Sequence, residues 1–290
     1  MIENYFIHLL IMIGIYIILT LSLNLALGYT GLINLAHIAL FGIGAYTSTL
    51  LTNANVPFLL AFIIAGLFTS LFGYFLVFTT NKLKGDYLAM ATLGFSFVVF
   101  SLMLNLTEIT RGPLGIPGIK KPEFFGFIIE SNYAYLIFVA IICILSILII
   151  TKIIKSPFGR LLQATRDDEL GLRILGKNTF SLKCKALMIS AFFAGIAGSL
   201  FAHYITFIDP TSFALNELIL VLTLVIVGGI ASIKGSIIAP FIIIFLTESL
   251  RFLPLPSSFV GPLREIIYAL ALLLILYFRP RGIFGKVDIA

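Results

Sequence analysis

Residues 28–46, with the sequence GYTGLINLAHIALFGIGAY, combine glycines and polar side chains within an otherwise apolar stretch. Gly28, Gly31 and Asn34 interrupt the hydrophobic pattern, which predicts a broken membrane helix. Backbone groups at such a break can bind a solute at membrane depth. His37 is costly in lipid and should therefore face a bundle interior or a cavity. A structural histidine beside an ordinary interhelical turn is the alternative.

A later histidine, His203, is expected at the outer end of another span, where water can reach it. The residues that we predict to border the helix break or a translocation pathway are Gly28, Gly31, Asn34, His37, Gly42, Gly44 and His203.

A second segment, residues 156–176, has the pattern of a short amphipathic helix between basic residues. Ser156 can cap a helix that begins at Pro157, and Gly171 or Gly176 can end it. One face of this helix carries Phe158, Leu161, Leu162 and Thr165. Such a helix either lies among lipid headgroups or inserts into a groove on a partner protein. Its mixed charges favour the protein partner, because a lipid-surface helix would be mostly basic.

The chain that holds these segments is too apolar for a water-soluble fold. Hydrophobic residues make up 60% and charged residues 11% of the 290 positions, and the mean hydropathy is +1.13. Soluble domains carry about 25% charged residues. The composition therefore predicts an all-α membrane protein, a polytopic bundle of about 8–10 transmembrane helices. We expect a single transmembrane domain over residues 1–290, with a long inner loop at about 152–185.

Nine stretches qualify as transmembrane helices by their length and apolar composition. The first is expected to be a retained helix rather than a cleaved signal. The nine cover residues 7–27, 34–51, 57–79, 88–106, 133–151, 186–206, 214–233, 236–252 and 263–278. A Gly- and Pro-rich loop at about 107–132 should form turns rather than a helix.

Basic residues set the orientation of these spans. With the C-terminus inside, residues 80–87, 152–185, 230–236 and 279–290 are cytoplasmic and hold 14 of the 19 Lys and Arg residues. The outer segments hold the other five: Arg111, Lys120, Lys121, Arg251 and Arg264. The net charge of +6 follows from this sorting and from attraction to anionic lipid, so we expect no nucleic acid partner.

Small residues recur every four positions at Ser190, Ala194, Gly198 and Ala202. In lipid this spacing lets two helices approach closely. It predicts a dense bundle, with tight packing within the chain or against a second membrane subunit.

Signatures of catalysis are missing from the sequence. It contains no HExxH motif, no paired-cysteine metal spacing and no phosphate-binding GxxxxGK[ST] loop. Cys143 and Cys184 do not form a disulfide framework. We expect neither a bound metal nor catalytic residues, and any ATP must be bound by another chain.

Four blocks of the sequence, in this order, resemble the high-affinity branched-chain amino acid permeases of bacterial ABC importers. They are residues 28–46, residues 85–94 (GDYLAMATLG), residues 156–176, and residues 194–203, which contain AGIAG and then Ala202-His203. The resemblance covers about residues 25 to 285. The LivM-type subunit is the better match, because of Gly85-Asp86-Tyr87 and the outer Gly-Pro loop.

The resemblance implies a permease with broken helices in the bacterial inner membrane. It implies a second, LivH-like permease subunit, two cytosolic ATPase subunits that bind ATP-Mg, and a periplasmic protein that delivers Leu, Ile or Val. No cofactor would be bound by this chain. The amphipathic segment would couple the ATPases to the permease through Pro157, Gly159, Arg160, Ala164, Arg166, Asp167, Glu169 and Gly176.

Urea or amide permeases share this architecture, so the substrate stays open between these solutes. An ion- or proton-coupled carrier that works alone is a competing class. The amphipathic inner loop and the lack of intramembrane acids in series favour the ATP-driven class. A membrane-embedded enzyme has little support, because no nucleophile, base and metal set is clustered in the sequence.

Overall fold

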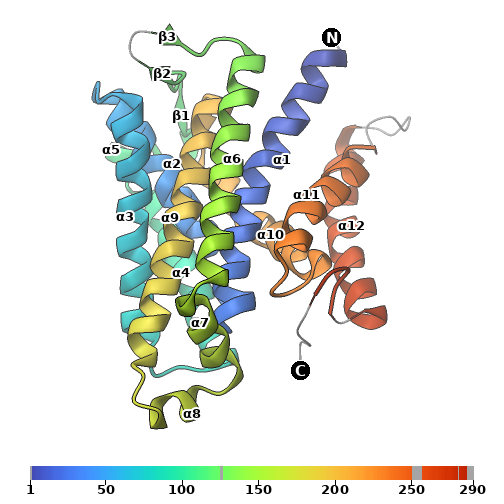
Figure 1. The fold of residues 1–290 in the computed structure, drawn as a ribbon. Coiled ribbons are helices and arrows are strands. Elements are labelled where there is room, and N and C mark those ends of the chain that lie inside the picture. Colours follow the sequence, from blue (N-terminus) through green and yellow to red (C-terminus); the bar gives the residue numbers. More distant parts are fainter. Residues whose placement is uncertain (1, 125–126, 250–256, 280, 286–290) are drawn as a thin grey trace.

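The computed structural model describes residues 2–124, 127–249, 257–279 and 281–285, and this part of the chain is a helical bundle (Figure 1). The fold class is therefore the predicted all-α class. The longer helices are α1 (Ile2–Asn24), α2 (His37–Asn53), α3 (Phe58–Thr80), α4 (Asp86–Asn105), α6 (Asn132–Lys155), α9 (Thr179–Ile205), α10 (Leu215–Gly228), α11 (Ile233–Glu248) and α12 (Ser257–Phe278). A π-helix, η1 (Leu25–Tyr29), extends α1.

Six of these helical segments are long and apolar enough to cross a membrane: Glu3–Tyr29, Phe58–Thr80, Asp86–Asn105, Asn132–Lys155, Thr179–Ile205 and Pro210–Gly228. The other three predicted spans fall on α2 with 17 residues, α11 with 16 and α12 with 22. Residues 250–252 of the predicted eighth span lie outside the described residues, as does Arg251. Each of the nine predicted stretches thus lies wholly or mostly on a described helix.

The two ends of the bundle differ. The first turn of α1 lies at the end that carries the strands, whereas α7 (Pro157–Asp167) and α8 (Glu169–Ile174) project from the opposite end (Figure 1). The turn between α10 and α11 points toward the α7–α8 end.

The end opposite α7 and α8 carries a thin irregular layer. The Gly- and Pro-rich loop was predicted to form turns rather than a helix, but it contains the one-turn helix α5 (Thr107–Thr110) and the 3-10 helix η2 (Gly112–Leu114). Three short strands follow: β1 (Ile116–Pro117), β2 (Glu123–Phe124) and β3 (Phe127–Ile128). β1 pairs antiparallel with β4 (Phe207–Ile208), and β2 pairs with β3. The 3-10 helix η3 (Pro210–Phe213) then leads into α10.

Polar side chains define where several helices begin. Asn178 accepts a hydrogen bond from the Ser181 N–H at the start of α9, and Ser232 accepts one from the Gly235 N–H at the start of α11. These bonds satisfy backbone donors that the first helical turn leaves free. Short polar residues between apolar runs therefore set the helix boundaries.

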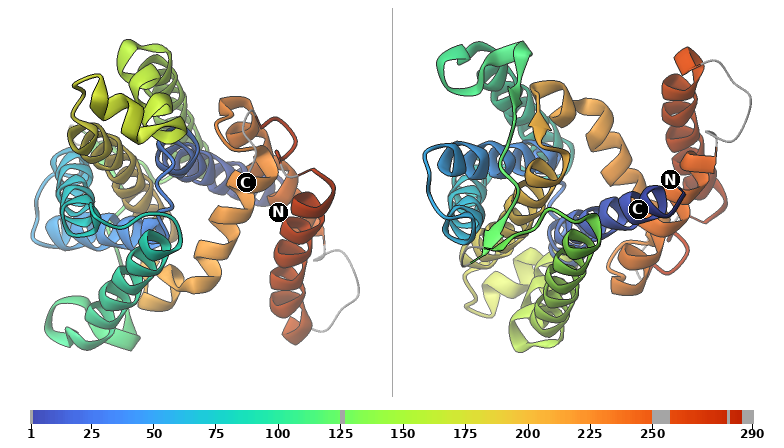
Figure 2. Two further views of the ribbon diagram at one scale, coloured as in Figure 1. Left: turned by 90° about the horizontal axis from the view of Figure 1, so that it is seen from below. Right: turned by 90° about the horizontal axis from the view of Figure 1, so that it is seen from above.

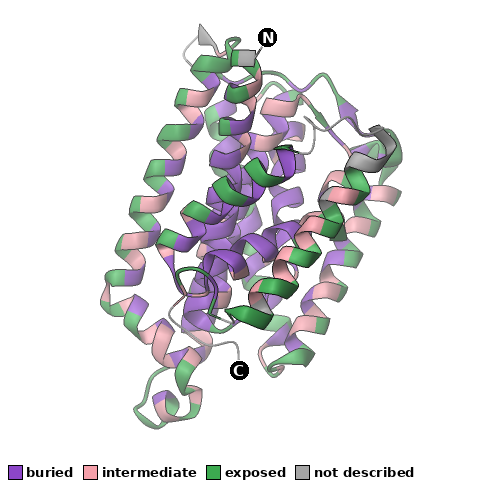
Figure 3. Cartoon of the chain, turned by 90° about the vertical axis from the view of Figure 1, so that its right-hand side faces the viewer, coloured by how far each residue is buried: buried purple, intermediate pink, exposed green. Residues whose placement is uncertain are grey.

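The core is widest around α1, α2 and α9, whose residues are mostly buried (Figure 3). A Cβ on Gly44 would lie 2.7 Å from the Gly195 carbonyl carbon, and one on Gly198 would meet the Phe41 carbonyl oxygen. The predicted small-residue stripe of α9 thus packs on α2 of the same chain. Gly42 and Gly44 lie within regular helix, so the predicted helix break does not extend to them; their role is close packing.

Candidate functional site

The end of α1 that lies next to α7 is irregular, because a π-helix and an i→i−6 hydrogen bond interrupt the α-helical pattern. The π-helix over Leu25–Tyr29 widens the final turns. The Leu27 carbonyl then accepts from the Gly31 N–H, and the Ala26 carbonyl accepts from the Leu32 N–H. Gly31 has a φ of +72°, which favours glycine. The predicted break is therefore present, and it begins at Gly28 and Gly31 as expected.

Arg166 of α7 completes this helix end. Its Nη1 donates to the Gly28 carbonyl oxygen at 2.7 Å, and its Nε donates to Asp167 at 2.8 Å. A Cβ on Gly31 would lie 2.9 Å from Arg166 Cγ. A cation at a helix C-terminus stabilises the orphan carbonyls and the negative end of the helix dipole. The structure thus brings together residues from the two predicted segments.

Residues 31–36 connect the end of α1 to α2 without helical structure, and α4 supplies hydrogen bonds to them. The Thr92 hydroxyl lies 3.1 Å from the Leu35 N–H and 3.3 Å from the Ile33 carbonyl. Ser96 donates to the Leu35 carbonyl at 2.9 Å. Non-helical backbone in a membrane protein requires such internal partners. The sequence reasoning missed both hydroxyls, although their four-residue spacing places them on one face of α4.

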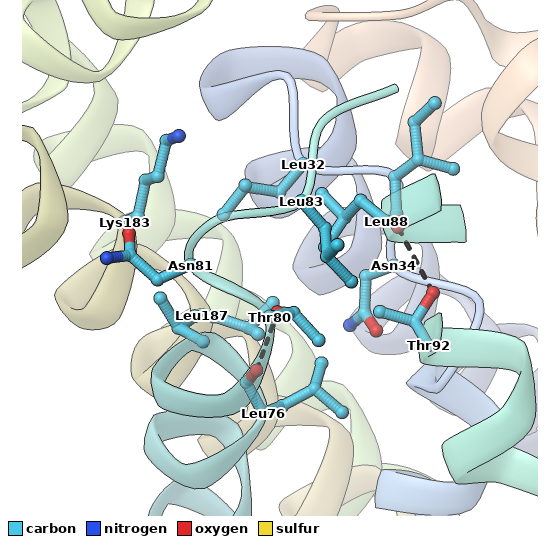
Figure 4. A pocket seen from close by; sticks show the side chains of 12 residues that line it. Leu32, Asn34, Leu76, Thr80, Asn81, Leu83, Leu88, Thr92, Lys183 and Leu187 are labelled. Atoms are coloured by element: carbon cyan, nitrogen blue, oxygen red, sulfur yellow. Dashed lines mark hydrogen bonds between the residues drawn. The ribbon is translucent and has the colours of Figure 1, made fainter. Parts of the chain in front are cut away.

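A narrow cavity borders this unwound segment (Figure 4). Asn34 and Thr92 stand beside each other on one side of it, with Asn81 and Lys183 on the other (Figure 4). Asn34 Nδ2 has no partner among the described residues. The cavity holds about 10 Å³, roughly the space of one water molecule. It is too small for an amino acid, so the break itself is not a solute cavity in this conformation.

Asn24, which the sequence reasoning did not single out, joins the end of α1 to the α10–α11 turn. Its Nδ2 lies 2.7 Å from Ser236 Oγ and 3.2 Å from the Ser232 carbonyl oxygen. Its Oδ1 accepts from the Ala231 N–H at 2.9 Å. The sequence signal that could have identified this residue was a single Asn inside the first apolar span, because an amide side chain in the membrane needs hydrogen-bond partners.

His37 begins α2 and is completely buried. Its Nε2 lies 2.9 Å from Ser22 Oγ, and the Ser22 hydroxyl also contacts the Leu19 carbonyl at 2.8 Å. Ser190 of α9 donates to the Ser22 carbonyl at 2.7 Å. Through Nε2 the histidine thus joins α1 and α2 beside α9, but its buried Nδ1 has no hydrogen-bond partner among the described residues, so it is not the fully satisfied structural histidine of the alternative.

The remaining predicted pathway residues lie apart from this site. A Cβ on Gly42 would meet Met103 and Phe213 within the bundle. His203 was expected to be accessible to water, but it is buried, and its Nδ1–H donates to the Lys120 carbonyl at 2.7 Å. The outer loop covers this end of α9, which the apolar pattern of α9 could not reveal.

The predicted amphipathic helix is two helices. Ser156 accepts from the Gly159 N–H at 3.3 Å and Pro157 is the first residue of α7, as expected. α7 ends at Asp167 because Asp168 leaves helical geometry and caps α8, accepting from the Gly171 N–H at 2.9 Å. The predicted end at Gly171 is therefore wrong, whereas Gly176, with a φ of +74°, follows the end of α8.

The apolar face of α7 packs largely against its own chain. Leu162 and Thr165 are buried, and Phe158, Leu161 and Ala164 are half-buried. Gly159 fits against the Ile153 carbonyl, to which a Cβ would come within 2.5 Å. Arg160 and Asp167 are exposed. The free apolar surface belongs to α8 and its end, where Leu170, Ile174 and Leu175 are 62%, 86% and 75% exposed.

Glu169, the first residue of α8, is the centre of an ion cluster. Its carboxylate lies 2.8 Å from Lys183 Nζ of α9, 2.6 Å from Arg173 Nη2 and 3.7 Å from Lys84 Nζ of the α3–α4 connection. The Glu169 and Lys183 side chains are only 12% and 9% exposed. Burial raises the pKa of the Glu169 carboxyl, but the hydrogen bond and charge of Lys183, with Thr179 and Arg173, outweigh it and hold this pKa below its usual value.

A larger cavity of about 170 Å³ lies between α2, α4 and the η3–α10 segment. Its walls are largely aliphatic and aromatic, and Ser96 contributes a hydroxyl. The lining includes Ile38, Leu93, Ser96, Phe97, Phe100 and Leu218. This volume is comparable to that of one branched aliphatic residue.

Comparison with known proteins agrees with these features. The family described as the branched-chain amino acid transport system permease component matches residues 5–277. The LivM permease protein of Escherichia coli is 38% identical over 261 residues, which cover 82% of this chain and 61% of that protein. This chain thus spans about three-fifths of the length of that relative.

More distant relatives match over most of their length. A probable LivM protein of Methanocaldococcus jannaschii is 26% identical and covers 97% of this chain and 93% of its own. The LivH permease protein of Escherichia coli is 23% identical over 94% of this chain and 92% of its own. No solved structure matches the chain. With its multi-pass helical bundle and a family match over residues 5–277, the chain belongs to the family of branched-chain amino acid transport permeases and is of the LivM type.

Proposed function

We propose that this chain is the membrane-spanning permease subunit of an ATP-driven importer that moves Leu, Ile or Val across the bacterial inner membrane. Its C-terminus is cytoplasmic. A LivH-like permease subunit, two cytosolic ATPase subunits and a periplasmic binding protein complete the machine. The chain itself contributes no catalytic residue and binds no cofactor, because ATP-Mg is bound by the ATPases.

The observation that carries this proposal is the α7–α8 element. It projects beyond one end of the bundle (Figure 1), and seen from below it lies on the side away from α12 (Figure 2). Ile174 at the end of α8 and the following Leu175 are largely exposed there. An exposed apolar helix end of this kind suits a groove on a soluble protein. Lipid binding is less favourable, because the exposed Asp168 places a negative charge at the start of the same helix. The ATPase-contacting helix is thus α8, while α7 anchors it to the bundle.

The apolar cavity between α2, α4 and α10 supports the branched aliphatic substrate. A hydrocarbon side chain gains by leaving water for aliphatic walls, at about 0.8 kcal/mol per buried CH₂ group. Urea or an amide would lose hydrogen bonds to water in the same place. The wall residues Leu93 and Phe97 are therefore proposed to border the pathway.

Reconstitution tests the proposal. Proteoliposomes that hold this chain with its second permease and ATPase subunits should take up leucine, isoleucine or valine only when ATP and the loaded binding protein are present. Uptake of urea in preference to leucine would favour an amide permease. Uptake by this chain alone, driven by an ion gradient, would overturn the proposal in favour of a secondary carrier.

A charge placed on α8 tests the docking surface. Ile174→Glu should lower co-purification of the ATPase subunits and ATP-driven uptake by about tenfold, because a buried carboxylate without a partner opposes association. Leu114→Glu is the matched control, since Leu114 is 82% exposed at the opposite end. Full ATPase binding by the Ile174→Glu variant would exclude α8 as the docking helix.

A further inference from the structure

Three elements that are far apart in the sequence meet at the inner end of α1. The Gly28 carbonyl receives Arg166 of α7 at 2.7 Å. Four residues earlier, Asn24 bonds to the α10–α11 turn through Ala231 and Ser236. The end of α1 is therefore held from two sides, by the coupling element and by a turn that lies more than 60 residues beyond it.

The elements that meet at the end of α1 are closely packed. A Cβ on Gly28 would lie 2.5 Å from the Ala231 backbone nitrogen, so η1 and the α10–α11 turn touch through their main chains. On the other side, a Cβ on Gly31 would lie 2.9 Å from Arg166 Cγ. Closely packed interiors respond to displacement as rigid bodies that shift between arrangements, not by gradual deformation. A shift of α7 would thus displace the end of α1 and, with it, the α10–α11 turn.

The far side of the α10–α11 turn is fixed as well. The Ile283 N–H donates to the Val227 carbonyl at 2.9 Å, and the Phe284 N–H donates to the Gly228 carbonyl at 3.1 Å. Residues 281–285 are therefore attached to the end of α10 by backbone hydrogen bonds. The turn links α10, which borders the apolar cavity, to α1.

We propose that Arg166 and Asn24 are positioning residues that carry the movement of the α7–α8 element to α10 and α11 through the inner end of α1. This inference rests on the proposed function, because it needs an ATPase that moves α7 and α8. Arg166 holds the end of α1 through its hydrogen bond to the Gly28 carbonyl. Asn24 transmits the displacement of α1 to the α10–α11 turn. Neither residue contacts the solute.

The test compares uptake with ATP hydrolysis in the same proteoliposomes, which contain the complete assembly and the leucine-loaded binding protein. Arg166→Gln removes the guanidinium, and Ser236→Ala removes the shortest contact of Asn24 while leaving its amide in place. Each variant should hydrolyse ATP within about twofold of the unmodified assembly, yet import about tenfold less leucine per ATP. Arg166→Lys should recover part of the loss, because an ammonium group can also donate to a carbonyl.

Because both contacts lie on one route, the Arg166→Gln/Ser236→Ala double variant should be no worse than the more impaired single variant. Lys155→Gln is the control: it removes an exposed charge next to α7. Unchanged leucine import per ATP in Arg166→Gln, or losses that multiply in the double variant, would overturn the inference while the proposed function stands. An unmodified assembly without ATP-driven uptake would instead overturn the proposed function, and the inference with it.

Discussion

Glu169 shows how one side chain can hold a cytoplasmic element to a membrane bundle. Its carboxylate joins α8 to α9 through Lys183 and reaches Lys84 on the α3–α4 connection. A largely buried ion pair adds little net stability over an apolar pair, but removal of one partner leaves the other charge unpaired. The cluster therefore fixes the position of α8, and loss of one of its charges is expected to destabilise the protein.

Replacement of Glu169 by Gln should destabilise the protein by about 1–3 kcal/mol, because the Lys183 ammonium then lacks its charged partner. The midpoint of thermal unfolding in detergent measures this loss. Glu108→Gln, at an exposed carboxylate of the opposite end, should leave the midpoint unchanged. Equal midpoints for Glu169→Gln and the unmodified protein would show that the ion pair has no structural role.

The same carboxyl predicts a pH dependence. Burial raises the pKa of the Glu169 carboxyl, but the hydrogen bond and charge of Lys183 help to lower it by more, so this pKa lies below its usual value in the folded protein. The folded protein therefore binds this proton less readily than the unfolded chain does. Its stabilisation is therefore complete above the unfolded pKa of about 4.3 and is lost as the pH falls through the folded pKa. The difference in midpoint between the unmodified protein and Glu169→Gln should stay constant from about pH 7 to about pH 5 and shrink as the pH falls below about 4.3. A difference that grows on acidification would contradict this sign.

At the scale of elements, sequence patterns predicted the spans but not all of their partners. Apolar runs and the Ser156-Pro157 cap are local signals, so the spans and the start of α7 were predictable. The helical pattern continues through Asp168, although this residue can also cap a new helix. Only tertiary packing decides between one long helix and two short ones. Likewise, Thr92 and Ser96 became recognisable as partners of residues 31–36 only once the fold placed α4 beside that segment.

The α2–α9 contact gives a graded prediction for glycines. Gly44→Ala places a methyl group against the backbone of Gly195, so α2 and α9 must separate, and we expect a loss of about 1–3 kcal/mol. Gly94→Ala is the matched control, because a Cβ on this α4 glycine would meet no atom within 4 Å. It should be neutral or stabilising by up to about 1 kcal/mol. Detergent-resistant monomer yield and thermal midpoints compare the two, and equal behaviour would exclude close α2–α9 packing.

At the scale of the whole molecule, orientation follows from charge rather than from packing. The structure places α7 and α8 opposite the strand layer, but a bundle without lipid does not distinguish inside from outside. The excess of Lys and Arg around α7 and α8 predicts that this end is cytoplasmic, because basic loops tend to stay in the cytoplasm. Burial at each end could not have been predicted this way, as the covered His203 illustrates.

Single cysteines test the orientation in a chain whose buried Cys143 and Cys184 are replaced by Ala. Leu114→Cys and Leu175→Cys suit this purpose, since both side chains are at least three-quarters exposed at opposite ends. With the α7–α8 end in the cytoplasm, a membrane-impermeant maleimide should label Leu114→Cys in right-side-out vesicles and Leu175→Cys in inside-out vesicles. The reverse labelling pattern would mean the opposite membrane orientation, with α8 on the outer side, where no cytosolic ATPase can reach it. Labelling of both variants from one side would instead mean an even number of crossings between the two positions, in conflict with α6 as a span.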